Sequence, residues 1–220
     1  MRGLSDVDLT LVETLDEALD MLAWLGERRE WLGLDVETTG LNARRDKIRM
    51  FQLGDATRGW ALPWRSWRGV AVEALRRYEG RVVMHNAMFD SKMLLADGVR
   101  VPQRLAHDTM VMARLLDSSR RAGLKAAAER YVDPRAGLGD KALRAAFSRG
   151  GWSWETIPED HPSYWTYAAL DAVETALMAE ELWPRVAEFR GPYELELAAA
   201  HVLRDMELAG MRVDVPYCLR

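Results

Sequence analysis

The sequence predicts an α/β fold, with a central sheet and helices on its faces, from three observations. Short apolar runs of strand length alternate along the chain with stretches of helical periodicity. The chain has 220 residues, 49% of them hydrophobic, which is enough for one good-sized domain with a substantial core. No apolar run reaches the length of a transmembrane helix, so we expect no membrane partner.

The expected strands and helices follow one another from the N-terminus. Strands are expected at residues 7–12, on an edge of the sheet, and at 31–37, 48–53, 60–62 and 81–85. Thr14 and Glu17 form a capping box ahead of an amphipathic helix that runs to about Leu25. Further helices are expected at residues 70–78, 89–96, 108–116, 124–131, 142–147 and 165–186. Pro184 is expected to stop the last of these helices.

The C-terminal part is expected to be organised separately. The Gly191–Pro192 pair is a helix breaker and a candidate domain boundary. A second amphipathic helix should cover residues 193–208, with Gly210 as its C-cap and a short extended piece at 211–214. The sequence reaches Arg220 without a terminating element, so we expect it to be a fragment of a longer protein.

Composition sets limits on compartment and partners. The single cysteine, Cys218, excludes an internal disulfide framework and a cysteine-cluster zinc site. The N-terminus has no signal-peptide pattern, which favours a cytoplasmic protein. The net charge of −4 does not indicate nucleic-acid binding, but local basic clusters matter more for such binding than the net charge does. The cluster of Arg44, Arg45, Lys47 and Arg49 is one, and taken alone it is best explained as a solvated face.

Two carboxylates at the end of a predicted buried strand are the most informative feature. Asp35 and Glu37 are two residues apart, and residues at this spacing project from the same face of a strand. Two like charges on one face repel each other unless a positive charge lies between them. Mg²⁺ and similar cations prefer carboxylate oxygens, so this pair predicts a metal site at the edge of the sheet.

Two further acidic residues have settings of the same kind. Asp90 follows a strand and should lie in the first turn of a helix, where the helix dipole alone could explain it. Tyr167 and Asp171 are four residues apart on the long helix and share one of its faces. The alternative for this second pair is an ordinary contact between an aromatic and a charged residue. Each motif is weak alone, and their order along the chain gives them meaning.

The three motifs together resemble the DEDD superfamily of 3′–5′ exonucleases, in its tyrosine-bearing branch. The segments 34–41, 85–90 and 167–171 carry the resemblance, and it extends over about residues 7–188. It implies a ribonuclease H-like exonuclease fold with a mixed central sheet flanked by helices. Residues 193–214 resemble the start of the polymerase part of family A DNA polymerases. We therefore expect an exonuclease domain at 1–190, and a linker helix with the start of a truncated polymerase domain at 191–220.

The resemblance also implies a catalytic role for each motif residue. Asp35, Glu37 and Asp171 should hold a divalent metal that activates water, and Asp90 should help to hold a second. Two such metals can activate a nucleophilic water and support the leaving oxygen. Mg²⁺ is expected at both positions, with Mn²⁺ able to substitute. Tyr167 should orient the water rather than act as a base, because the pKa of a free phenol is about 10.

The substrate contacts implied by the resemblance are Thr38, Leu41, Asn86 and Phe89, near the 3′-terminal nucleotides. Plain core packing is the alternative for Leu41 and Phe89. Bases could also stack on tryptophans, of which the candidates are Trp152, Trp154 and Trp165, although most of the nine tryptophans should be core residues.

Other polar residues receive structural interpretations. Asp108 is expected to be a helix N-cap rather than a ligand. The histidines at positions 85, 107 and 161 lack the spacing of a zinc site, and His161 has only a small chance of a catalytic role.

The function expected from these observations is metal-dependent 3′–5′ exonuclease action on DNA, releasing nucleoside 5′-monophosphates, as a polymerase proofreading domain. Its partners would be single-stranded DNA or a frayed 3′ end and the polymerase domain of the parent chain. Such a protein would be bacterial, or a phage protein in the host cytoplasm, and is expected to be a monomer. Two alternatives stay open: an RNA 3′–5′ exonuclease of the ribonuclease D type, and an inactive scaffold or DNA-binding module.

Overall fold

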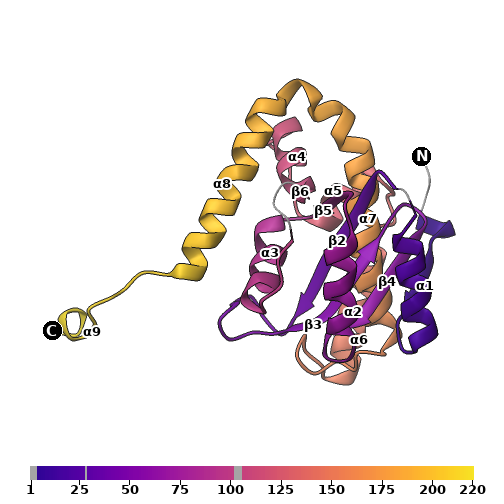
Figure 1. Ribbon diagram of the computed structural model, residues 1–220, viewed down its shortest axis with the longest axis horizontal. Helices are drawn as coiled ribbons and strands as arrows, with labels where there is room; N and C mark the ends of the chain where they lie inside the picture. Colours follow the sequence, from indigo (N-terminus) through magenta and orange to yellow (C-terminus); the bar gives the residue numbers. More distant parts are fainter. Residues whose placement is uncertain (1–3, 28, 102–105) are drawn as a thin grey trace.

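A mixed sheet forms the centre of the computed structural model, which describes residues 4–27, 29–101 and 106–220 (Figure 1). Its six strands, counted within those residues, lie in the order β1-β4-β3-β2-β5-β6. Strands β2 and β3 are antiparallel, as are β3 and β4, whereas β1 pairs parallel with β4, and β5 pairs parallel with both β2 and β6. The strands are β1 (Asp8–Leu11), β2 (Trp31–Thr38), β3 (Ile48–Gly54), β4 (Arg58–Pro63), β5 (Arg81–Met84) and β6 (Ala106–Asp108).

Helices cover both faces of this sheet. Helices α1 (Leu15–Leu25), α2 (Trp64–Arg77) and α3 (Ala87–Ala96) share one apolar core with the sheet. The long helix α7 (Pro162–Val186) packs on β1 to β5 from the other side, and α4, α5 and α6 pack on α7. Their bounds are α4 (Thr109–Leu116), α5 (Leu124–Tyr131) and α6 (Leu138–Gly150). The fold is thus the predicted α/β arrangement with a mixed sheet.

The alternation of side chains along β2 sets the direction of its carboxylates. Leu32, Leu34 and Val36 belong to the core shared with α1, α2 and α3. Because successive side chains of a strand point to opposite faces, Asp35 and Glu37 point to the α7 side. The carboxylates therefore face the helix that carries Tyr167 and Asp171.

Helix α7 approaches the sheet closely because three glycines lie beneath it. A Cβ built on Gly33 would lie 1.9 Å from the carbonyl oxygen of Ala172. Cβ atoms on Gly54 and Gly59 would also come within 3 Å of α7 atoms. No side chain larger than hydrogen fits at Gly33, so this residue fixes the distance between β2 and α7.

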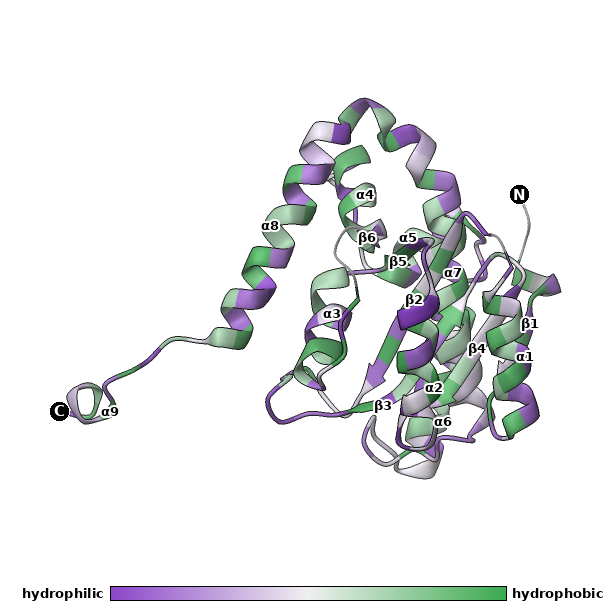
Figure 2. Ribbon diagram, in the orientation of Figure 1, coloured by the Kyte–Doolittle hydropathy of each residue, from purple (hydrophilic) through white to green (hydrophobic). Residues whose placement is uncertain are grey.

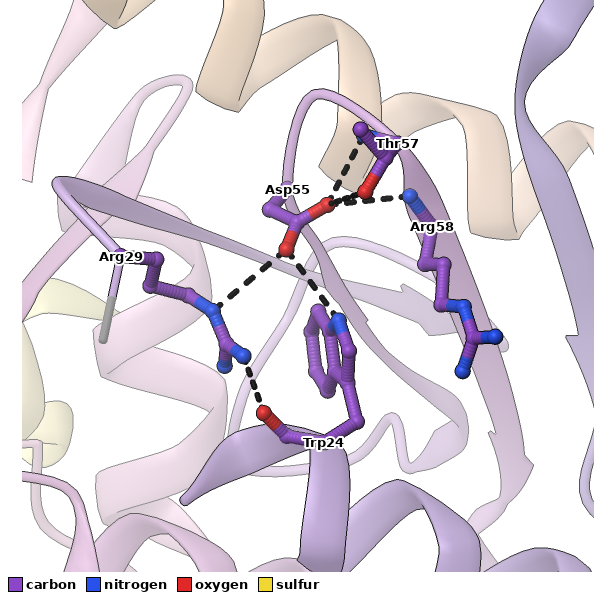
Figure 3. A network of polar contacts seen from close by, with 5 residues as sticks. All are labelled: Trp24, Arg29, Asp55, Thr57 and Arg58. Carbon is purple, nitrogen blue, oxygen red and sulfur yellow. Dashed lines mark hydrogen bonds and ion pairs between the residues drawn. The ribbon is translucent and has the colours of Figure 1, made fainter. Parts of the chain in front are cut away.

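A polar network ties the end of α1 to the turn between β3 and β4 (Figure 3). The Asp55 carboxylate accepts hydrogen bonds from the Trp24 indole N–H at 3.1 Å and from the backbone N–H of Thr57 and Arg58. Arg29 forms an ion pair with Asp55 at 3.4 Å and donates to the Trp24 carbonyl. The Arg29 side chain is only 7% exposed, so Asp55 neutralises a largely buried charge.

Helix α8 (Arg190–Ala209) follows α7 after one turn of 3₁₀ helix at Ala187–Phe189. It turns back from α7, packs on α3 and α4, and then leads away from the body of the molecule (Figure 1). Hydrophobic and hydrophilic residues alternate along it (Figure 2). Apolar side chains that it leaves exposed include Leu195, Val202, Leu203 and Met206.

Four details differ from the sequence predictions. Gly191 and Pro192 do not interrupt a helix, because they lie in the first turn of α8. Backbone N–H groups in the first turn make no intrahelical hydrogen bond, so proline, which lacks this group, is tolerated there. Helix α7 begins at Pro162, three residues ahead of the predicted start, and it ends at Val186 as predicted, two residues after Pro184. Strand β6 was not predicted, since three residues give too short a pattern. Residues 211–214 have no regular structure, and a helical turn, α9 (Val215–Cys218), follows them.

The remaining helices are close to prediction, and α5 has the predicted bounds. Helix α2 begins at Trp64 and α6 at Leu138, several residues ahead of the predicted starts. The capping box of α1 is present, with Thr14 accepting from the Glu17 N–H. Within the described residues, no helix is long and apolar enough to cross a membrane.

Candidate active site

A hollow of about 470 Å³ lies at the C-terminal end of β2 and collects most of the predicted site residues. Asp35, Glu37, Asp90, Tyr167 and Asp171 all line it. They come from β2, the first turn of α3 and the middle of α7, three elements that are far apart in the sequence. The other residues of its wall are Val36, Thr38, Gly40, Leu41, His85, Phe89, Leu124 and Trp154.

Three carboxylates meet at one point of this hollow. One oxygen each from Asp35, Glu37 and Asp171 lies within 4.8 Å of the other two. Glu37 and Asp171 are nearly buried, at 9% and 4% exposure, and Asp35 is half-buried. Such a set of oxygen atoms fits a hard divalent cation, since Mg²⁺ and similar ions prefer carboxylate ligands.

The electrostatics of the cluster are those of crowded, buried acids. Burial raises the pKa of Asp35 to about 8, and the neighbouring Asp171 charge adds to the rise. Burial and the Asp35 charge also hold the pKa of Glu37 and of Asp90 well above their ordinary values. Burial and crowding therefore favour the protonated form of all three acids until a positive charge comes between them. A bound dication would supply that charge.

Asp90 lies beside the other carboxylates but is held differently. It is 2% exposed, in the first turn of α3, and its Oδ1 accepts a hydrogen bond from the Val36 N–H at 3.2 Å. This bond fixes Asp90 against the strand that carries Asp35 and Glu37. Burial raises the pKa of Asp90, and the charge of Asp35, which also belongs to the group of three carboxylates, adds to the rise.

Asp108 supports the turn that leads to Asp90. As predicted, it is the N-cap of α4 and accepts from the N–H groups of Met110 and Val111. It also accepts from the N–H groups of Asn86 and Ala87, at 3.1 and 2.8 Å, across the junction of β5 and α3. Asn86 has a φ of 70°, the one positive φ of a non-glycine residue among those described, and Asp108 stabilises this strained turn.

Tyr167 faces the carboxylates from α7, as the spacing to Asp171 predicts. Burial raises the pKa of its hydroxyl far above the ordinary value, and the charges of Asp171, Glu37 and Asp35 add to the rise. The phenol therefore keeps its proton and can donate a hydrogen bond. The Trp154 ring lies 6.2 Å from the Tyr167 ring, centroid to centroid, and forms part of the wall.

Two charged residues that the sequence did not indicate complete this region. The Lys125 ammonium, from α5, donates to Asp171 Oδ1 and to Glu174 Oε2, the second at 2.8 Å. Glu174 is fully buried on α7. The spacing of Tyr167, Asp171 and Glu174 puts all three on one helix face, but only the packing of α5 on α7 brings Lys125 to them.

The predicted substrate contacts divide into two groups. Thr38, Leu41 and Phe89 line the hollow, and Leu41 is 79% exposed, so it does not pack in the core. Asn86 is not part of the wall, and its backbone serves the turn described above.

The aromatic and histidine candidates are placed as follows. Trp152, Trp154 and Trp165 all pack against the core around Tyr164, and of the three Trp154 also lines the hollow. His161 is the N-cap of α7, where it accepts from the Ser163 N–H. His85, which also lines the hollow, contacts the Thr109 hydroxyl and the Ala122 carbonyl through its two ring nitrogens.

A mixed sheet with a carboxylate cluster at the end of a central strand offers the ligands for divalent ions of the kind that phosphodiester hydrolysis uses. The family model for the 3′–5′ exonuclease of the DNA polymerase A type matches residues 9–187. The chain belongs to this 3′–5′ exonuclease family.

Curated relatives are polymerases of phages and bacteria. A DNA polymerase of Mycobacterium phage D29 is 27% identical over 240 residues, which covers 96% of this chain and 38% of the phage protein. DNA polymerase I of Chloroflexus aurantiacus is 33% identical over 139 residues, covering 60% of this chain and 14% of that protein. The chain thus spans less than half the length of these relatives.

Solved structures share the fold. The catalytic core of RRP6 from Trypanosoma brucei superposes with a TM-score of 0.67 at 17% identity, over 92% of this chain and 54% of that one. NrnC of Brucella melitensis, solved with bound Mg²⁺, gives a TM-score of 0.60 at 18% identity, over 95% of this chain and 97% of that one. These similarities confirm the ribonuclease H-like fold of DEDD exonucleases that the sequence motifs implied.

Proposed function

We propose that this chain removes nucleotides from the 3′ end of DNA, as the proofreading exonuclease of a family A DNA polymerase. The observation that carries the proposal is the meeting of Asp35, Glu37 and Asp171 within 4.8 Å, beside Asp90 and Tyr167 in one hollow. Hydrolysis of the terminal phosphodiester would release nucleoside 5′-monophosphates. The phage and bacterial polymerase relatives support DNA as the substrate, and a cytoplasmic site of action.

The carboxylates would hold two divalent ions, with Mg²⁺ as the expected metal and Mn²⁺ as a substitute. Asp35, Glu37 and Asp171 would hold one ion, and Asp90, with Asp35 beside it, would help to hold the second. Bound ions would supply a more acidic water and support for the leaving 3′-oxygen. The Mg²⁺ in the NrnC structure supports this assignment for the shared fold.

Other residues of the hollow would position the reactants. The Tyr167 hydroxyl, which keeps its proton, would orient the attacking water by a hydrogen bond. The exposed Leu41 side chain and Phe89 would contact the terminal bases, and Thr38 the terminal nucleotide. Trp154 stands in the same wall and offers a ring on which a base could stack.

We also propose that residues 1–190 form the exonuclease domain, and that 191–220 are a linker helix and the start of the polymerase domain. Exposed apolar side chains on α8 support this division, because a following domain would cover them. The chain's partners would then be a frayed 3′ end and its own polymerase domain, with the exonuclease itself a monomer.

The test compares 5′-labelled DNA and RNA strands of one sequence, incubated with the purified chain and Mg²⁺. DNA should shorten stepwise from its 3′ end, and faster than RNA. The structural similarity to RRP6 supports the second candidate, an RNA 3′–5′ exonuclease. Preferential cleavage of RNA would favour that candidate, because the 2′-hydroxyl is the group that distinguishes the strands. No cleavage of either strand with Mg²⁺ or Mn²⁺ would favour an inactive scaffold.

A further inference from the structure

The ion pair between α5 and α7 lies directly against the proposed metal ligands. The Lys125 ammonium contacts Asp171, one of the three converging carboxylates, as well as Glu174. It also lies 4.5 Å from the centroid of the Tyr167 ring. Lys125 therefore touches three residues of the same face of α7, two of which belong to the proposed active site.

Glu174 keeps this ammonium in place. It has no exposed surface, and its Oε1 has no hydrogen-bond partner among the described residues. Its Oε2 accepts from Lys125 at 2.8 Å, and within the described part of the chain Lys125 is the cation paired with it. A buried carboxylate without its counter-charge is strongly unfavourable. Glu174 therefore shares the Lys125 ammonium with Asp171 and offers it a second acceptor beside the metal site.

We propose that Lys125 is a built-in counter-charge that competes with a divalent cation for the Asp171 carboxylate, and that Glu174 is the second acceptor toward which the ammonium moves when a cation binds. This inference rests on the proposed metal site. The ammonium repels a cation that binds the same carboxylate, so cation binding shifts the ammonium away from Asp171 and toward Glu174. Lys125 is thus a positioning residue that lowers the repulsion among the carboxylates and tunes metal affinity.

The competition predicts opposite effects for two variants that break the same ion pair. Lys125→Met removes the competing charge, so the affinity for Mn²⁺ should rise by at least about fivefold, the lower end of typical coupling between two bound groups in a protein. Glu174→Gln removes the partner that draws the ammonium away from Asp171, and it also removes nearby negative charge. Mn²⁺ affinity should then fall, by about the same factor.

The experiment is titration calorimetry of Mn²⁺ into the full chain after treatment with a chelator. Lys92→Met is the matched control, because the Lys92–Glu207 pair also joins two helices, at 2.7 Å, and Lys92 has a similar exposure of 15%. This variant should bind Mn²⁺ with wild-type affinity. Thermal melts with and without Mn²⁺ give a second reading, in which Lys125→Met should gain more stability from Mn²⁺ than the wild type does.

The outcomes separate the two proposals. If the wild type binds no Mn²⁺, the proposed function itself fails. If the wild type binds Mn²⁺ and both variants keep its affinity, Lys125 is only a tether between α5 and α7, and the inference is overturned. Should Lys125→Met fail to fold, Glu174→Gln decides the question alone, since unchanged or tighter binding in that variant would contradict the competition.

Discussion

Replacing Gly33 by alanine should separate the two elements that carry the carboxylates of the proposed active site. The new Cβ would lie 1.9 Å from the Ala172 carbonyl oxygen, whereas real Cβ contacts essentially never fall below 3.0 Å. Strand β2 and helix α7 must therefore move apart by about 1 Å, and a densely packed interior resists such a shift. Overpacking of this kind costs typically 1–3 kcal/mol and occasionally more, and we expect about 3 kcal/mol because the obstacle is backbone.

The assay is urea denaturation followed by tryptophan fluorescence, together with a thermal melt. A loss of about 3 kcal/mol corresponds to a fall in Tm of roughly 6–12 °C for a domain of this size. The affinity for Mn²⁺ should fall as well, because Asp35 and Asp171 move apart with their elements.

Gly69 provides the matched control. A Cβ there meets no atom within 4 Å, and the residue lies in helix α2. Gly69→Ala should therefore be neutral or stabilise the protein by up to about 1 kcal/mol, the helix preference of alanine over glycine. If Gly33→Ala were as stable as Gly69→Ala, the close approach of α7 to β2 would not be what positions the site, and the reasoning would be refuted.

Three further predictions follow from the site and the core. In chelator, the free energy of unfolding should fall as the pH rises from about 6.5 to 8.5, because with a pKa of about 8 Asp35 binds more protons in the folded state than in the unfolded state. Buried His85, with its pKa lowered to about 4, has the opposite effect on stability, but only below this pH window. Thermal melts that show rising stability across the window would contradict the argument that burial raises the Asp35 pKa. Tyr167→Phe should reduce turnover while Mn²⁺ affinity in calorimetry stays within about twofold, since in the proposed mechanism the hydroxyl orients water and is not a ligand. Unchanged turnover would remove Tyr167 from the mechanism. Asp55→Ala should lower the free energy of unfolding, measured by urea denaturation, by about 2–4 kcal/mol, because it leaves the Arg29 charge buried without its partner. A loss below about 1 kcal/mol would show that solvent reaches Arg29.

The parts of the site that the sequence predicts correctly depend on local periodicity. Asp35 and Glu37 share a strand face because the period of a strand is two, and Tyr167 and Asp171 share a helix face because they are four apart. Asp90 lies in the first turn of α3, as the strand-to-helix junction predicts. In each case, one element determines where the side chain points.

The parts that escape prediction depend on how elements pack. Lys125 reaches Asp171 only because α5 lies on α7, and no pattern within residues 124–131 indicates that contact. From sequence alone, a glycine inside a strand only predicts a less stable strand. The role of Gly33 follows from the packing of Ala172 against it, which the sequence does not show. The predicted break at Gly191–Pro192 was wrong because proline is compatible with the first turn of a helix, and sequence alone does not say where that turn begins.

The most direct test of the metal site is 3′-end cleavage by Asp35→Ala combined with Glu37→Ala. This double variant removes two of the three converging carboxylates, and exposed Asp16 and Asp20 on α1, changed together to alanine, give a control of equal charge. We predict near-total loss of stepwise DNA shortening in the site variant and full activity in the control. In chelator, the Tm of the site variant should be at or above that of the wild type, because the repulsion among the three carboxylates is relieved. Retention of most cleavage activity by the folded site variant would contradict the assignment of these carboxylates.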